Sequence, residues 1–164
     1  MGADVYHFVD SEGGLANSGH SAYAVGNDND GYTVYDYQPN GLSGSGVSGS
    51  SSSGESRIQG GFSNITSALD YLNSNRSDEH NFDKAQKWNT TPTEDAAARQ
   101  AANSFMGEDY SLFDHNCYDL GPDAIIKAIN EMREPSVQID ISNGPIPNTA
   151  FNYNNDHGAI AVFE

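Results

Sequence analysis

The apolar positions in the first forty residues fall into three short runs separated by polar turn residues. Runs of this length, rich in Val, Tyr and Phe, predict β-strands at residues 5–9, 20–26 and 31–38. The last two runs flank Asn27-Asp28-Asn29-Asp30, and these residue types favour tight turns, so a hairpin is expected. Such a loop could also bind calcium, but it lacks the Glu that closes a helix-loop-helix site, so a plain turn is the stronger interpretation.

Residues 39–60 are almost entirely Gly and Ser, without an apolar pattern that could offset the entropy of ordering them. We expect a flexible loop, lid or insertion there. Helical spacing returns with Ile65, Leu69 and Leu72, which predict a short amphipathic helix. A second helix is expected over 91–106, because a polar cap and acidic residues open it and a glycine ends it.

The longest helical stripe predicts a helix from Tyr118 to Met132, with Pro122 early enough to fit its first turn. A short strand is expected at 83–90. The alternating residues at 137–141 and the apolar run at 158–163 predict edge or closing strands. A chain of 164 residues suits one domain, 1–164.

The charge balance limits the possible partners. A net charge of -16 repels phosphate backbones and anionic membranes, so we expect no nucleic-acid partner and favour a cationic one. One cysteine excludes an internal disulfide, and no apolar run approaches the ~20 residues of a membrane-spanning helix. The first residues lack the features of a signal peptide, which fits either a cytosolic protein or the end of a larger exported protein.

The only cysteine, Cys117, lies where the predicted helix of residues 118–132 begins. The helix dipole lowers a thiol pKa at that position, which favours a nucleophile, but a free cysteine is often a small buried apolar residue. A nucleophilic thiol needs a base, and His20 is the best of the five histidines because it begins a strand directly after Gly19. His115 is kept as a substrate-side or structural residue.

A third residue would orient the imidazole from the neighbouring strand. Folding the hairpin places His20 opposite residues 35–38, where Asp36 is chemically the best partner and Gln38 the next. A register shift by one residue would favour Tyr35 or Tyr37 instead. Asn116 and the Cys117 amide could donate to an oxyanion, while an ordinary helix cap is an equally good role for Asn116.

Two motifs carry a family resemblance: the run from Gly19 through Asp28, and Asn116-Cys117-Tyr118-Asp119 after Tyr110-Ser111-Leu112. They resemble the toxin-type domains that follow Rhs repeats. Those domains belong to the circularly permuted branch of the papain-like NlpC superfamily, which includes the lecithin:retinol acyltransferase type. In that branch the histidine strand precedes the cysteine helix, as His20 precedes Cys117 here.

The resemblance implies a papain-like α+β fold, with an antiparallel sheet packed on the cysteine helix. It further implies a Cys/His thiol site with Cys117 as nucleophile and His20 as base, supported by Asp119 of the same motif. The third polar position is not matched to a single residue.

The expected function is a cysteine amidase or peptidase that acts through a thioester, as a secreted bacterial toxin or effector domain delivered into a target cell. A peptidoglycan stem peptide or a protein amide is the expected substrate, and an immunity protein an expected partner. The alternatives are acyl transfer, glutamine deamidation or a non-catalytic acidic binding module. We expect no cofactor, no metal and no membrane insertion.

Overall fold

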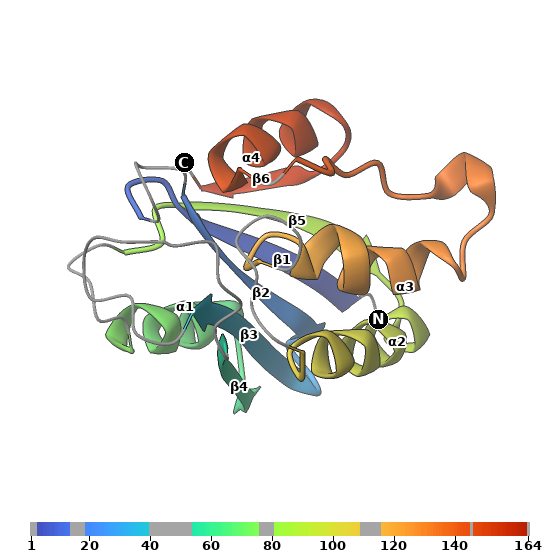
Figure 1. Ribbon diagram of the computed structural model, residues 1–164. Helices are drawn as coiled ribbons and strands as arrows, with labels where there is room; N and C mark the ends of the chain where they lie inside the picture. Colours follow the sequence, from blue (N-terminus) through green and yellow to red (C-terminus); the bar gives the residue numbers. More distant parts are fainter. Residues whose placement is uncertain are drawn as a thin grey trace.

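Six antiparallel strands form one sheet in the computed structural model, which describes residues 3–13, 19–39, 54–75, 81–108, 116–144 and 146–163 (Figure 1). Their order across the sheet is β4-β3-β2-β1-β5-β6. The strands are β1 (Ala3–Asp10), β2 (His20–Asn27), β3 (Gly31–Pro39), β4 (Gly54–Phe62), β5 (Lys84–Thr90) and β6 (Ile160–Phe163). The α+β class predicted from the sequence is confirmed.

Helices cover both faces of this sheet. They are α1 (Ile65–Ser74), α2 (Pro92–Phe105), a π-helix (Leu120–Ile125) that continues into α3 (Ile126–Asn130), and α4 (Pro147–Asp156), with a 3-10 turn at Pro135–Val137. Figure 1 shows α2 and α3 side by side, with α1 separate from them. The helix predicted over 118–132 therefore begins as a π-helix.

Strand β2 shows why both faces are covered, because all eight of its residues are buried. Side chains alternate between the two faces of a sheet. Tyr23 and Val25 pack with α2, the π-helix and α3, whereas Ala22 and Ala24 pack with α1. The strand that begins with His20 is thus enclosed between two apolar cores.

The hairpin between β2 and β3 is the one expected from the sequence. The Asn27 Oδ1 atom accepts hydrogen bonds from the backbone N–H groups of Asn29 and Asp30, and its Nδ2 atom donates to Asp30. These are the local bonds of an Asx turn. The side chain of Asn27 is therefore used to build the turn.

Three segments differ from their expectations. The end of the predicted loop 39–60 forms β4, which pairs with β3, while residues 40–53 lie outside the described part of the chain. Residues 137–141 form no strand, because the Asn130 side chain bonds both backbone groups of Ile139. Helix α4 occupies a segment in which the sequence predicted no helix or strand. It begins at a proline, and burial of Ala150 and Phe151 compensates for its poor helix formers.

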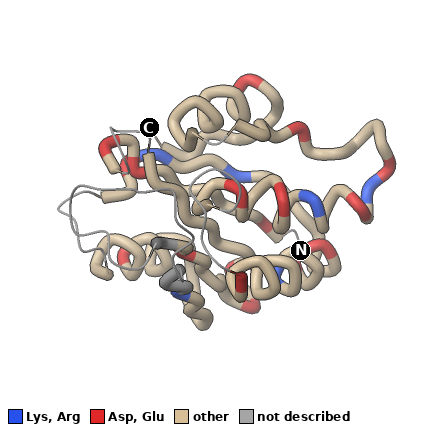
Figure 2. Tube along the Cα trace, viewed as in Figure 1, with Lys and Arg blue, Asp and Glu red and all other residues tan. Residues whose placement is uncertain are grey.

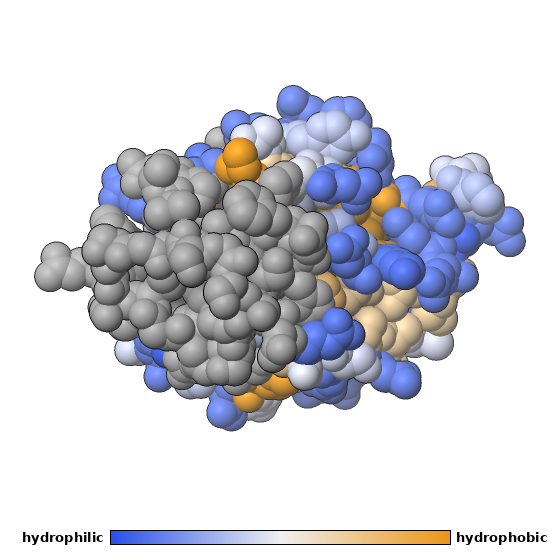
Figure 3. Space-filling view, viewed as in Figure 1, coloured by the Kyte–Doolittle hydropathy of each residue, from blue (hydrophilic) through white to orange (hydrophobic). Residues whose placement is uncertain are grey.

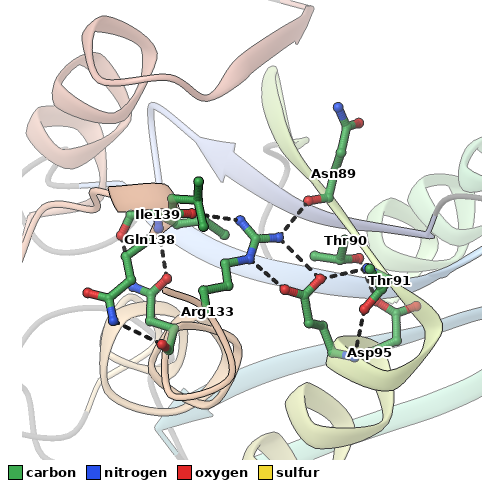
Figure 4. Close-up of polar contacts among 10 residues, drawn as sticks. Asn89, Thr90, Thr91, Asp95, Arg133, Gln138 and Ile139 are labelled. Carbon is green, nitrogen blue, oxygen red and sulfur yellow. Dashed lines mark hydrogen bonds and ion pairs between the residues drawn. The ribbon is translucent and has the colours of Figure 1, made fainter. Parts of the chain in front are cut away.

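An ion pair fastens the end of α3 to the start of α2 (Figure 4). The Arg133 guanidinium donates to both carboxylate oxygens of Glu94, at 2.5 and 3.2 Å, and to the carbonyl of Asn89. Glu94 also closes a capping box with Thr91, at the helix start for which the sequence predicted a polar cap and an acidic first turn. One side chain thus ties β5, α2 and α3 together.

The surface is dominated by polar and acidic groups. Figure 2 shows Asp and Glu on most elements and few Lys or Arg, and the described surface in Figure 3 is largely hydrophilic on the side shown. No helix in the described residues is long and apolar enough to cross a membrane.

Candidate functional site

His20 and Asp36 form a buried pair on the neighbouring strands β2 and β3. The His20 Nε2 atom lies 2.7 Å from Asp36 Oδ1, and the two side chains are only 11% and 2% exposed. Phe82 packs against the imidazole, with 5.8 Å between the ring centroids. Because Nε2 is hydrogen-bonded to Asp36, Nδ1 is the ring nitrogen that can interact with a thiol.

Four residues of β3 were candidates to orient the His20 imidazole, and the strand register favours Asp36. Ala22 pairs with Asp36, and Tyr23 pairs with Tyr35. Tyr35 and Tyr37 lie in the core beside α2 and the π-helix, where the Tyr37 hydroxyl bonds the carbonyl of Glu108. The side chain of Gln38 lies outside the described residues.

Asn116 holds the turn that carries Cys117. Its Oδ1 atom accepts hydrogen bonds from the backbone N–H groups of Tyr118 and Asp119, and the Asp119 carboxylate accepts one from the Asn116 N–H. This reciprocal arrangement is a capping box. It matches the helix-cap interpretation of Asn116 and gives Asp119 a structural task in the same turn.

A proline changes the hydrogen bonding of the next turn. Pro122 has no N–H to donate to the carbonyl four residues earlier, that of Tyr118. The carbonyl of Tyr118 accepts instead from the N–H of Gly121 and from the Tyr23 hydroxyl at 3.0 Å. Strand β2 thereby holds both His20 and, through Tyr23, the turn after Cys117.

Gly121 makes this close approach possible. A Cβ atom at this position would lie 2.3 Å from the Tyr23 hydroxyl oxygen, a distance that real side chains do not tolerate. The pKa of Tyr23 is raised well above its ordinary value, mainly by burial and then by Tyr118 and Cys117. The hydroxyl therefore stays protonated and keeps its role as donor.

Cys117 and Asp36 together set the charge of His20. Burial acts to lower the pKa of the ring, but the charge of Cys117 and hydrogen bonds with Asp36 and Cys117 outweigh burial and raise the pKa to about 10. The imidazole is therefore protonated at neutral pH.

Comparisons with known proteins were made at three levels. Neither the protein-family models, nor the curated proteins, nor the solved structures contain a match to this chain. The chemistry of the site must therefore be inferred from its own residues.

The arrangement has the parts of a nucleophilic site. The Cys117 side chain is 6% exposed, and its backbone N–H makes no hydrogen bond to another described residue. An N–H group in this position could donate to an oxyanion formed at the sulfur. In the described ranges, no group of three or more His, Cys, Asp or Glu side chains is placed to hold a metal ion.

The other histidines do not join this pair. His7 is fully buried in β1, and His157 is exposed just after the end of α4, where its Nδ1 atom contacts the carbonyl of Tyr153. His80 and His115 lie outside the described residues, as does the Tyr110-Ser111-Leu112 run. Sequence reasoning missed Tyr23 and Phe82, because apolar strand and loop residues carry no sign of which side chain they will contact.

An open groove of about 480 Å³ runs beside the same helix, between α3 and residues 138–143. Pro122, Ile126 and Ile139 supply much of its apolar lining, and Lys127 and Asp140 supply charges. Cys117 and His20 do not line it. The groove is therefore separate from the thiol.

Proposed function

We propose that this protein is a cysteine hydrolase of the amidase or peptidase class, built on a circularly permuted papain-like arrangement. The observation that carries the proposal is the His20 imidazole held between Asp36 and Cys117, with its pKa raised by both. The antiparallel sheet, and the order of a histidine strand before a cysteine turn, support the same proposal.

In the proposed reaction the Cys117 thiolate attacks the carbonyl carbon of an amide, and a carbon–sulfur bond forms. The carbonyl oxygen takes the negative charge and accepts a hydrogen bond from the Cys117 N–H. His20 then gives its proton to the leaving amine as the carbon–nitrogen bond breaks, which leaves a thioester. A water molecule gives His20 a proton and attacks the thioester, which releases a carboxylic acid and restores the thiolate.

Asp36 holds the imidazole in place and stabilises its charge. Asn116 and Asp119 have a structural role, because their hydrogen bonds hold the turn that carries the proposed nucleophile. The substrate class we propose is a peptide or protein amide, with a peptidoglycan stem peptide as one candidate. The biological setting we propose is a secreted bacterial toxin or effector domain.

The single cysteine allows a direct test without a known substrate. Iodoacetamide labels Cys117 alone, so the labelling rate at neutral pH reports the thiolate content of this one residue. We expect the parent protein to react faster than a free thiol and His20→Ala to react more slowly than the parent. Ser136→Ala, an exposed change in the 3-10 turn, is the control. A parent rate no faster than a free thiol would favour a non-catalytic binding module.

The reaction type is tested separately by mass spectrometry of candidate targets incubated with the parent and with Cys117→Ala. Shortening of a target indicates hydrolysis, a gain of about one mass unit indicates deamidation, and a larger gain indicates acyl transfer. All three pass through the same thioester. Equal modification by parent and Cys117→Ala would exclude this thiol as the nucleophile.

A further inference from the structure

His7 lies at the centre of the sheet and is hydrogen-bonded at both ring nitrogens. Its Nε2 atom is 2.9 Å from the Ser21 hydroxyl, and its Nδ1 atom is 2.8 Å from Gln86 Nε2. All three side chains are 0% exposed. A polar chain thus crosses β2, β1 and β5 inside a layer that is otherwise apolar and aromatic.

The same ring supports the turn that follows Cys117. His7 pairs with Tyr23 across β1 and β2, and their rings stack 4.8 Å apart with only 12° between their planes. The Tyr118 ring lies 5.6 Å from His7. Because the Tyr23 hydroxyl bonds the carbonyl of Tyr118, His7 contacts both partners of that bond.

The hydrogen bonds of His7 also connect it to the segment that carries His20, the proposed base. Ser21 directly follows His20 in β2, so a bond from His7 to Ser21 restrains the start of the strand that presents the imidazole. His7 therefore contacts the start of β2 through Ser21 and the cysteine turn through Tyr23. The distance between these two segments decides whether the thiol and the imidazole are in contact.

The histidine is neutral in this place. Burial lowers the pKa of His7 to about 3, so one of its nitrogens donates and the other accepts. With the Gln86 amide donating to Nδ1, the Nε2–H group donates to Ser21. The Gln86 Oε1 atom has no hydrogen-bond partner among the described residues, a cost that an apolar side chain would avoid.

We propose that His7 is a positioning residue for the Cys117–His20 pair, acting through Tyr23 on the cysteine turn and through Ser21 on the start of β2. The proposal rests on the proposed function. A buried polar chain suits this task because its hydrogen bonds are directional, whereas apolar packing tolerates small shifts.

The test is the pH profile of Cys117 alkylation in a variant that replaces the whole chain with apolar groups, His7→Phe/Ser21→Ala/Gln86→Leu. We expect the pH profile of the parent to differ from that of a free thiol, with faster alkylation at pH 7. The triple variant should keep its circular dichroism spectrum and a cooperative melt, with its midpoint moved toward the free-thiol value and its rate at pH 7 reduced several-fold.

Ser21→Ala alone provides a milder change if the triple variant does not fold, with Ser104→Ala on the exposed side of α2 as the matched control. We expect Ser21→Ala to move the midpoint in the same direction and Ser104→Ala to leave it unchanged. A folded variant with the parent profile would overturn the positioning role and leave the proposed function standing. A parent profile equal to that of a free thiol would overturn both.

Discussion

The Nε2 atom of His20 lies 2.7 Å from Asp36 Oδ1, although the sheet pairs Asp36 with Ala22 and not with His20. The carboxylate therefore reaches the ring diagonally across the two strands. This contact fixes which ring nitrogen faces Asp36 and leaves the other for the sulfur.

Removing the thiol should lower the pKa of His20. Cys117 is the largest of the influences that raise this pKa, so Cys117→Ala leaves burial to act against Asp36 alone. We expect NMR titration of the ring to show a lower pKa in the variant than in the parent. Identical titrations would mean that the sulfur does not interact with the ring.

The same pKa shift predicts how stability depends on pH. A histidine whose pKa rises on folding contributes stability that is fully present below its ordinary value of 6.5 and is lost as the pH rises through about 10. Denaturant unfolding should therefore show the parent losing stability over this range. In Cys117→Ala the loss should be smaller and should end at lower pH, because the folded-state pKa of His20 is lower, and equal curves for the two proteins would contradict this.

Asp36→Asn should reduce the reactivity of Cys117 while leaving the fold intact. The amide matches the carboxylate in size but removes the negative charge that stabilises the imidazolium, so we expect hydrolysis to fall by roughly 10²-fold or more. Steady-state rates on a cleaved amide would measure this. Asp70→Asn on the exposed side of α1 serves as the control and should keep the parent rate.

Gly121→Ala should destabilise the protein by about 1–3 kcal/mol, the usual cost of overpacking a core. The new Cβ atom would push against the Tyr23 hydroxyl and the turn that it holds. Chemical denaturation measures the change. Gly144→Ala is the matched control, because the nearest atom to its new Cβ is 3.4 Å away. Equal stabilities for the two variants would show that the turn can move without cost.

Arg133→Gln should reduce stability by about 1–3 kcal/mol at neutral pH, because hydrogen bonds to a charged group are lost. Arg133 and other bonds hold the pKa of Glu94 below its ordinary value of 4.5. The contribution of this carboxylate is thus present above about pH 4.5 and is lost as the pH falls. Parent and variant should converge in acid, while Lys127→Gln, at an exposed position of α3, should behave like the parent.

Features made by neighbouring residues were predictable from the sequence. The hairpin follows from the turn chemistry of residues 27–30, and the start of α2 follows from Thr91 and its capping box. The pairing of His20 with Asp36 was also predictable, because the hairpin places only a few residues of β3 within reach of His20. Asp36 was nevertheless one of four choices, since a shift by one residue reverses every side chain in a strand.

Features made by distant contacts were not predictable in this way. Strand β4 follows a Gly/Ser stretch and forms because β3 offers it a partner, and α4 forms because Phe151 finds a buried place. The role of His7 depends on β1 lying between β2 and β5, an order that no local pattern carries. A histidine inside a strand gives no indication of the face on which it will lie.

The position of the cysteine late in the chain has a consequence during biosynthesis. The hairpin with His20 and Asp36 is made before Cys117, which follows only after β5 and α2. A growing chain that stops before this turn contains the imidazole and the carboxylate without a sulfur. Any reactivity that needs all three groups therefore cannot begin before the segment that contains Cys117 has been made and folded.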